Sequence, residues 1–221
     1  MTTLSRSLTL VSGLSVALTG TALADDRDGD VFARTRPAAD RAVEVSVQGG
    51  YSQGVGDLGG GLGSLEDLTS AGGGGELKLG YRIIPNLTVG AYGSLSGYAL
   101  GDDLADTGVI GATAGVFADW HFRPRHAVDP WIELGTGWRG LWLSPDDDMK
   151  TTSLQGFELA RAQVGVDYRV SREIAISPVI GASLSMFAWE DSPATMDHTE
   201  IDGKEANLYV FGGLQGRFSL R

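Results

Sequence analysis

The dominant pattern along the chain is an alternation of apolar and polar residues that begins at Val43 and continues to Leu220. In the first run, apolar residues stand at every second position and Glu44 lies on the opposite face. Successive side chains of a β-strand point to opposite faces, so each run predicts a strand with one apolar and one polar face. No segment shows an equally strong helical period, and the pattern predicts an all-β fold.

Eight such runs follow one another. They cover residues 43–51, 76–83, 87–96, 110–122, 132–142, 160–169, 174–186 and 207–220. Short and long connections alternate between them. The short ones are Pro85-Asn86, Pro124–Asp129 and Ser171–Glu173, and the long ones are Ser52–Gly75, Ala99–Thr107, Ser144–Ser153 and Glu190–Lys204. An even number of antiparallel strands with short turns at one end is typical of outer-membrane barrels, and a bilayer requires the sheet to close. The sequence therefore predicts an eight-stranded antiparallel up-and-down transmembrane β-barrel.

Aromatic residues of the apolar face should mark the two membrane interfaces. With the short turns in the periplasm, the expected periplasmic girdle is Tyr81, Trp120, Phe122, Tyr168 and Phe218, and the outer one is Tyr51, Trp138 and Trp142. The clearest charged exception on this face is Glu158, expected near the outer start of its strand. A secreted, lipocalin-like barrel is the soluble alternative, with its apolar face turned inward around a ligand.

The first 24 residues have the features of a secretory signal peptide. A stretch of 11 apolar and small residues from Leu8 precedes Ala22-Leu23-Ala24, which has the form of a cleavage site. We expect three parts: a signal peptide at 1–24, a flexible periplasmic arm at 25–41 and the barrel at 42–221. The predicted location is the cell outer membrane.

The formal net charge of −11 argues against nucleic acid as a partner, because nucleic-acid binding needs clustered Lys and Arg. The absence of Cys excludes disulfides, thiol catalysis and Cys-ligated zinc. Acidic residues gather in the long connections. Arginines gather toward the other end, at Arg82, Arg123, Arg125, Arg169, Arg172, Arg217 and Arg221. Ten glycines between Ser52 and Gly75 predict a first loop without fixed shape.

The alternating pattern, together with the Ser-Pro-Val-Ile-Gly-Ala run at Ser177–Ala182, resembles the small Gram-negative outer-membrane barrels of the OmpA transmembrane-domain and OmpX type. The resemblance implies outer-membrane lipid and lipopolysaccharide as surroundings, and the barrel-insertion machinery as a partner. That machinery commonly reads a terminal outward aromatic in this family. Here Phe218 faces outward, while the last residue is Arg221.

The polar face carries charges that should converge inside the barrel. The candidate lumen network consists of Glu44, Glu76, Lys78, Glu133, Arg139, Arg161 and Asp167. An eight-stranded barrel is just wide enough for its own side chains, and buried charges need partners. We expect Arg139 and Arg161 to pair with Glu133 and Glu76. If the lumen conducts ions, its gate would consist of Glu76, Lys78, Glu133, Arg139 and Arg161.

Catalysis is not expected, since the histidines at 121, 126 and 198 lack a serine partner at the outer rim. We expect no cofactor and no metal site, and a monomer. The sequence therefore favours an outer-membrane barrel with a structural or surface-interaction role. A small ion channel gated by lumen charges is the first alternative, and a soluble ligand-binding barrel is the second.

Overall fold

A computed structural model describes residues 37–38, 41–59, 62–69, 71–99, 107–145, 151–191 and 198–220. The predicted signal peptide lies outside these residues, as does most of the predicted arm. Among the described residues, no helix has the length and apolar character needed to cross a membrane.

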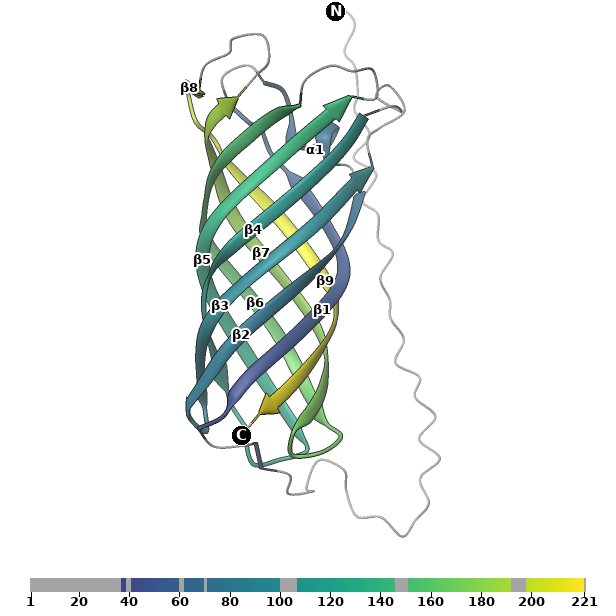
Figure 1. Cartoon of the computed structure of the whole chain (residues 1–221), viewed down its shortest axis with the longest axis vertical. Coiled ribbons are helices and arrows are strands. Elements are labelled where there is room, and N and C mark those ends of the chain that lie inside the picture. The colour runs from purple at the N-terminus through teal and green to yellow at the C-terminus, as the bar shows by residue number, and fades with distance from the viewer. Residues whose placement is uncertain are drawn as a thin grey trace, which may run out of the picture.

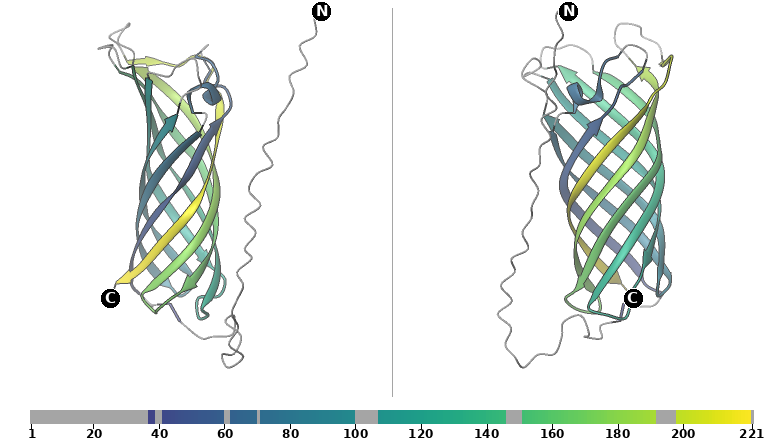
Figure 2. Two further views of the ribbon diagram at one scale, coloured as in Figure 1. Left: turned by 90° about the vertical axis from the view of Figure 1, so that its right-hand side faces the viewer. Right: turned by 180° about the vertical axis from the view of Figure 1, so that it is seen from behind.

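The described chain forms a closed, tall β-barrel (Figures 1 and 2). The barrel strands are β1 (Val43–Val55), β2 (Ala71–Ile84), β3 (Leu87–Ala99), β4 (Thr107–His121), β5 (Val128–Pro145), β6 (Thr152–Arg169), β7 (Ile174–Asp191) and β9 (Ala206–Leu220). The two smaller elements are α1 (Leu65–Leu68) and β8 (His198–Glu200), which pairs with the last residues of β7 from Trp189 to Asp191. The predicted all-β, eight-stranded antiparallel barrel is confirmed.

Closure runs through the first and last strands. β1 pairs antiparallel with β9 from Val43 opposite Leu220 to Val55 opposite Leu208, and β6 pairs with β7. Every backbone edge of the eight strands therefore has a neighbour, as a bilayer demands. The chain end of β9 lies at the end of the barrel opposite to β8 (Figure 1). We call the end of the barrel that holds the chain end of β9 the short-turn end, and the end that holds β8 the long-loop end.

The two faces of the wall separate as the alternation predicted. Large apolar side chains are exposed outside, with Leu95 at 66% and Ile180 at 63% of their full area, while Lys78 and Glu133 are buried inside. In water such an exterior would aggregate, because soluble proteins rarely expose apolar patches of this extent. The soluble barrel is thereby excluded, and lipid is the medium that fits this surface.

The first connection differs from the prediction. β1 extends to Val55 and β2 begins at Ala71, so Gly72, Gly73, Gly74 and Gly75 lie in a strand and not in a loop. The remaining connection, 56–70, has a defined shape over its described residues. The Ser64 hydroxyl caps α1 by accepting a hydrogen bond from the Glu66 amide at 3.2 Å. Asp57 and Ser64 form an isolated antiparallel β-bridge. The prediction of a shapeless loop is wrong.

The short-turn end includes the described part of the predicted arm. The Ala38 amide donates to the Pro124 carbonyl at 2.8 Å, and Ala38 is buried. Pro124 lies in the β4–β5 turn, whereas the chain enters β1 at Val43. Since β1 and β4 are separated by β2 and β3 in the sheet, this contact brings the N-terminal segment beneath the barrel opening.

Candidate functional site

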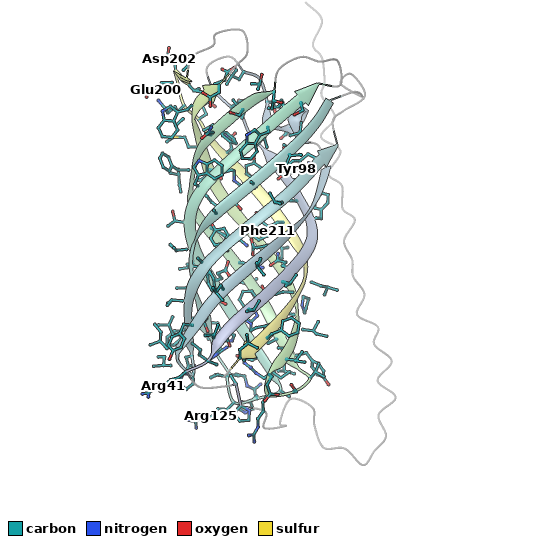
Figure 3. The ribbon with its side chains drawn as sticks, viewed as in Figure 1. Arg41, Tyr98, Arg125, Glu200, Asp202 and Phe211 are labelled. Carbon is teal, nitrogen blue, oxygen red and sulfur yellow. The ribbon has the colours of Figure 1, made fainter. Side chains whose placement is uncertain are left out.

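The barrel interior is polar because alternate residues of all eight strands point into it. All seven residues of the predicted lumen network are buried there. In Figure 3, Phe211 is labelled about half way up the barrel and Tyr98 nearer the long-loop end. The charged groups form three clusters at different heights.

The central cluster joins two cations to two carboxylates. Arg161 reaches Glu76 at 2.7 Å through Nη1 and Glu133 at 3.1 Å through Nε. Lys78 donates to Glu133 and lies 3.4 Å from Glu76. Gln163 accepts from both cations at 3.0 Å. The predicted pair of Arg161 and Glu76 is present, and each cation contacts both carboxylates.

Aromatic rings flank this cluster. The Arg161 guanidinium lies 4.7 Å from the Tyr92 ring centre and 4.5 Å from that of Phe211. Lys78 Nζ lies 5.5 Å from the ring centre of Phe117. Cations held against aromatic faces gain electrostatic attraction without losing their carboxylate partners. The flanking rings also restrict the paths along which the cations could move.

The cluster toward the long-loop end overturns two predictions. Arg139 pairs with Glu158 at 2.8 Å rather than with Glu133, and it donates to Ser183 at 3.0 Å. Glu158 also accepts from the Tyr92 hydroxyl and is fully buried. The expectation that Glu158 faces outward is therefore wrong.

A β-bulge is the reason. Glu158 pairs with Ser185 and Ala160 pairs with Leu184, so β6 carries one extra residue opposite β7. Leu159 and Ala160 are consequently both exposed, and the residues on either side of the bulge change face. The adjacent apolar residues at 159 and 160 were the signal in the sequence that the alternation breaks.

The third cluster occupies the short-turn end. Arg82 pairs with Glu44 at 2.8 Å, Arg217 with Asp119 at 3.0 Å, and Arg169 with Asp129 at 2.7 Å. The Asp167 carboxylate accepts from the Ser177 hydroxyl. Arg82, Arg169 and Arg217 thus point into the lumen, which is also where the alternation of their strands predicts them.

Three metal-ligand groups converge in that cluster. Atoms of His121, Asp129 and Asp167 lie within 4.8 Å of one another. His121 Nδ1 lies 2.9 Å from Asp129, while its Nε2 lies 3.3 Å from Arg82 and 3.2 Å from Arg217. Guanidinium groups therefore already occupy the positions from which a cation would approach this imidazole, and the arrangement fits an ion-pair network.

A cavity of about 50 Å³ lies between the central cluster and the long-loop end. Its walls include Gln48, Glu76, Arg139, Arg161 and Phe211. This volume admits a few water molecules. It is far below the roughly 300 Å³ at which ligand pockets begin. The cavity therefore suits water or a single small ion.

The long-loop mouth is closed by an apolar cluster. Leu58 and Leu65 of the first connection are fully buried against Tyr98 and Tyr209 of the wall. Other members of the cluster are Val109, Leu141, Leu154, Phe187 and Ile201. We call residues 56–69 the mouth plug, leaving aside its undescribed positions 60 and 61. In the sequence, the only indication of this plug is a pair of leucines, Leu58 and Leu65, in a segment rich in glycine.

No protein-family model matches the sequence, and no curated protein matches it. Among solved structures, Neisserial surface protein A aligns with a TM-score of 0.56 at 13% identity, covering 80% of this chain and 97% of its own. Ail of Yersinia pestis aligns at 0.48 and 13% identity, covering 81% and 100%. OprG from Pseudomonas aeruginosa aligns at 0.48 and 9% identity, covering 81% and 98%.

The likeness to Neisserial surface protein A shows that this chain has the fold of the small eight-stranded outer-membrane barrels. The apolar exterior independently requires a lipid environment. The protein is accordingly a transmembrane β-barrel of the outer membrane.

Proposed function

We propose that the protein is a closed scaffold of the outer membrane with a structural or surface-interaction role and without catalysis. The observation that carries the proposal is the filling of the lumen. Three ion-pair clusters span the interior, and the mouth plug covers it at the long-loop end. A barrel filled in this way is suited to anchoring its long loops outside the membrane more than to passing solutes.

The long-loop end offers an acidic surface for such interactions. Glu66, Glu200, Asp202 and Glu205 are exposed there, and Lys204 contacts Glu200 at 2.6 Å. The Lys204 ammonium lowers the pKa of Glu200 below its ordinary value by donating a hydrogen bond to the carboxylate. We place this surface at the lipopolysaccharide leaflet, and we assign delivery of the chain to the barrel-insertion machinery.

A strain lacking the protein tests this role through the detergent sensitivity of its outer membrane. Wild-type protein should restore resistance. A variant with Glu200→Gln, Asp202→Asn and Glu205→Gln should restore it fully if the barrel acts as a structural element, and incompletely if its surface contacts matter. Unchanged resistance in the deletion strain, together with unchanged surface adhesion, would contradict both roles.

A small ion channel is the second candidate, favoured by the shared pairing of the central cluster. Lys78 and Arg161 each contact both Glu76 and Glu133, so partners can be exchanged without exposing a lone charge. Such an exchange would connect the cavity with the short-turn end. It would also require the mouth plug to move, because Leu58 and Leu65 close the path above.

Planar-bilayer recording separates the two candidates. The scaffold predicts no resolvable unitary current in the wild type or in Glu133→Gln. The channel predicts small currents that change in Glu133→Gln and increase when Leu58→Ser and Leu65→Ser are combined. Currents indifferent to all three substitutions would point to a leak around the protein and contradict the channel.

A further inference from the structure

The short-turn end carries a ring of exposed arginines outside the lumen. They are Arg41 ahead of β1, Arg123 and Arg125 in the β4–β5 turn, and Arg172 in the β6–β7 turn. We call these four residues the basic rim. Figure 3 shows Arg41 and Arg125 at the end of the barrel opposite to Glu200 and Asp202. Glu173 is the one exposed acidic residue among the described residues of these turns.

The rim arginines are distinct from those of the lumen. Arg82, Arg169 and Arg217 are at most 2% exposed and are paired with carboxylates. The rim arginines instead lie where the strands of the wall begin and end. The arginine group seen in the sequence thus divides into one set that neutralises the interior and another that faces outward.

The depth of the rim follows from the aromatic residues next to it. Exposed Phe122 directly precedes Arg123, and exposed Tyr168 lies four residues before Arg172. Val43, which pairs with exposed Tyr81, follows two residues after Arg41. Interfacial aromatic rings sit at the headgroup level of a bilayer. Guanidinium groups just beyond them are therefore at the height of lipid phosphates.

We propose that the basic rim binds the phosphates of anionic glycerophospholipids in the adjoining leaflet. Guanidinium groups donate paired hydrogen bonds to phosphate oxygens. Basic residues near an anionic membrane surface gain attraction that salt weakens. Because the rim residues come from three separate points on the barrel, the attraction acts around its circumference. The acidic long-loop end has the opposite charge, so the preference belongs to one leaflet.

The test is lipid selectivity of the full-length barrel in phosphatidylcholine bilayers. Trace spin-labelled phosphatidylglycerol and phosphatidylcholine are compared for association with the protein. We expect the wild type to favour phosphatidylglycerol about fivefold, the factor given by one basic contact at a charged surface. Combining Arg41→Gln, Arg125→Gln and Arg172→Gln should bring the ratio close to one. The variant with Glu200→Gln, Asp202→Asn and Glu205→Gln is the matched control and should retain the preference.

Raising the salt concentration on wild-type protein provides a second measurement that does not depend on folding of the variant. The preference should fall as the ionic strength rises. A wild-type ratio of one, a ratio that survives the triple arginine substitution, or a ratio indifferent to salt would each overturn the proposal. Sedimentation of the wild type with purified cell-wall polymer, combined with a lipid ratio of one, would assign the rim to cell-wall carboxylates instead.

Discussion

The Glu158 carboxylate faces the lumen because the single extra residue Leu159 shifts the alternation of β6. Inside the barrel, this carboxylate forms an ion pair with Arg139 and accepts a hydrogen bond from the Tyr92 hydroxyl. On the lipid face the same carboxylate would have no partner, and an unpaired charge there would lower the stability of the barrel. Sequence parity was reliable where the strand was regular. It failed at this position because a bulge inserts one residue into the strand, which reverses the face of the residues beyond it, while their polarity gives no sign of the insertion.

The pairing of Arg139 gives a prediction at this scale. Arg139→Ala and Glu158→Ala should each lower the free energy of unfolding by about 3 kcal/mol, because each leaves a buried charge without its partner. The double variant should cost clearly less than the sum. The measurement is urea unfolding in lipid vesicles. Pairing Arg139→Ala with Glu133→Ala serves as the control cycle, and a larger coupling there would favour the pairing expected from the sequence.

The lipid face gives a second residue-scale prediction. Val164 is 46% exposed on the outer face of β6, between Ile132 and Ile180 of the neighbouring strands. Val164→Arg should destabilise the barrel by about 2–4 kcal/mol if the side chain lies near the midplane. Val164→Leu is the control and should be close to neutral. Equal stability of the two variants in vesicles would contradict the assignment of this face to lipid.

At the scale of elements, glycines at neighbouring positions of β1 have different surroundings. A Cβ at Gly50 would lie 2.1 Å from the Gly212 carbonyl oxygen, whereas a Cβ at Gly49 would lie 3.9 Å from its nearest neighbour, the Gly74 oxygen. β1 and β9 therefore approach closely on the lumen side of Gly50. The sequence shows two identical residues, and only the coiling of the sheet distinguishes them.

Substitution of these glycines should be unequal. Gly50→Ala forces the two backbones apart and should cost about 1–3 kcal/mol, as overpacking does. In Gly49→Ala the added methyl group points toward lipid. This substitution should be neutral or slightly stabilising, because alanine reduces the conformational entropy of the unfolded chain. Unfolding in vesicles measures both. A milder effect at Gly50 than at Gly49 would contradict the β1–β9 geometry.

The mouth plug is an element that periodicity could not reveal. Its structure depends on Leu58 and Leu65 entering an apolar ring contributed by strands far apart in the sequence. Local composition, rich in glycine, pointed to a mobile loop. The glycines instead allow the turns, since Gly56, Gly59 and Gly63 have positive φ angles. The apolar contacts of Leu58 and Leu65, which form only when the barrel has closed, override the weak preference of the glycine-rich segment for an irregular loop.

Burial of Leu65 should protect the plug from proteolysis. Leu65→Ser removes apolar contacts from the cluster and should increase cleavage after Glu66 by a glutamate-specific protease about 10- to 100-fold, because local opening becomes easier. The rate is measured on folded protein in detergent. Lys204→Ser, at the same end of the barrel, should leave it unchanged. Rapid cleavage of the wild type would show that the plug is open in solution.

At the scale of the whole molecule, the alternation of residues was enough to predict the strand number, the antiparallel order and the two faces. It could not predict which charges meet, because strand tilt and stagger decide the height of each side chain. Arg161 and Glu76 illustrate the success, and Arg139 with Glu158 the failure. The same tilt brings charges of β2, β5 and β6 into one cluster.

The orientation of the barrel gives the last prediction. The turn at Pro85-Asn86 lies at the short-turn end, whereas Glu200 lies beyond the long-loop end of the wall. If the short turns face the periplasm, Glu200→Cys should react with a membrane-impermeant thiol reagent on intact cells. Asn86→Cys should react only after the outer membrane is breached, and the chain has no native Cys to interfere. The mobility shift of folded protein on unheated gels confirms that both variants form the barrel. Labelling of Asn86→Cys on intact cells would invert the orientation, and would place the basic rim, rather than the acidic loops, at the cell surface.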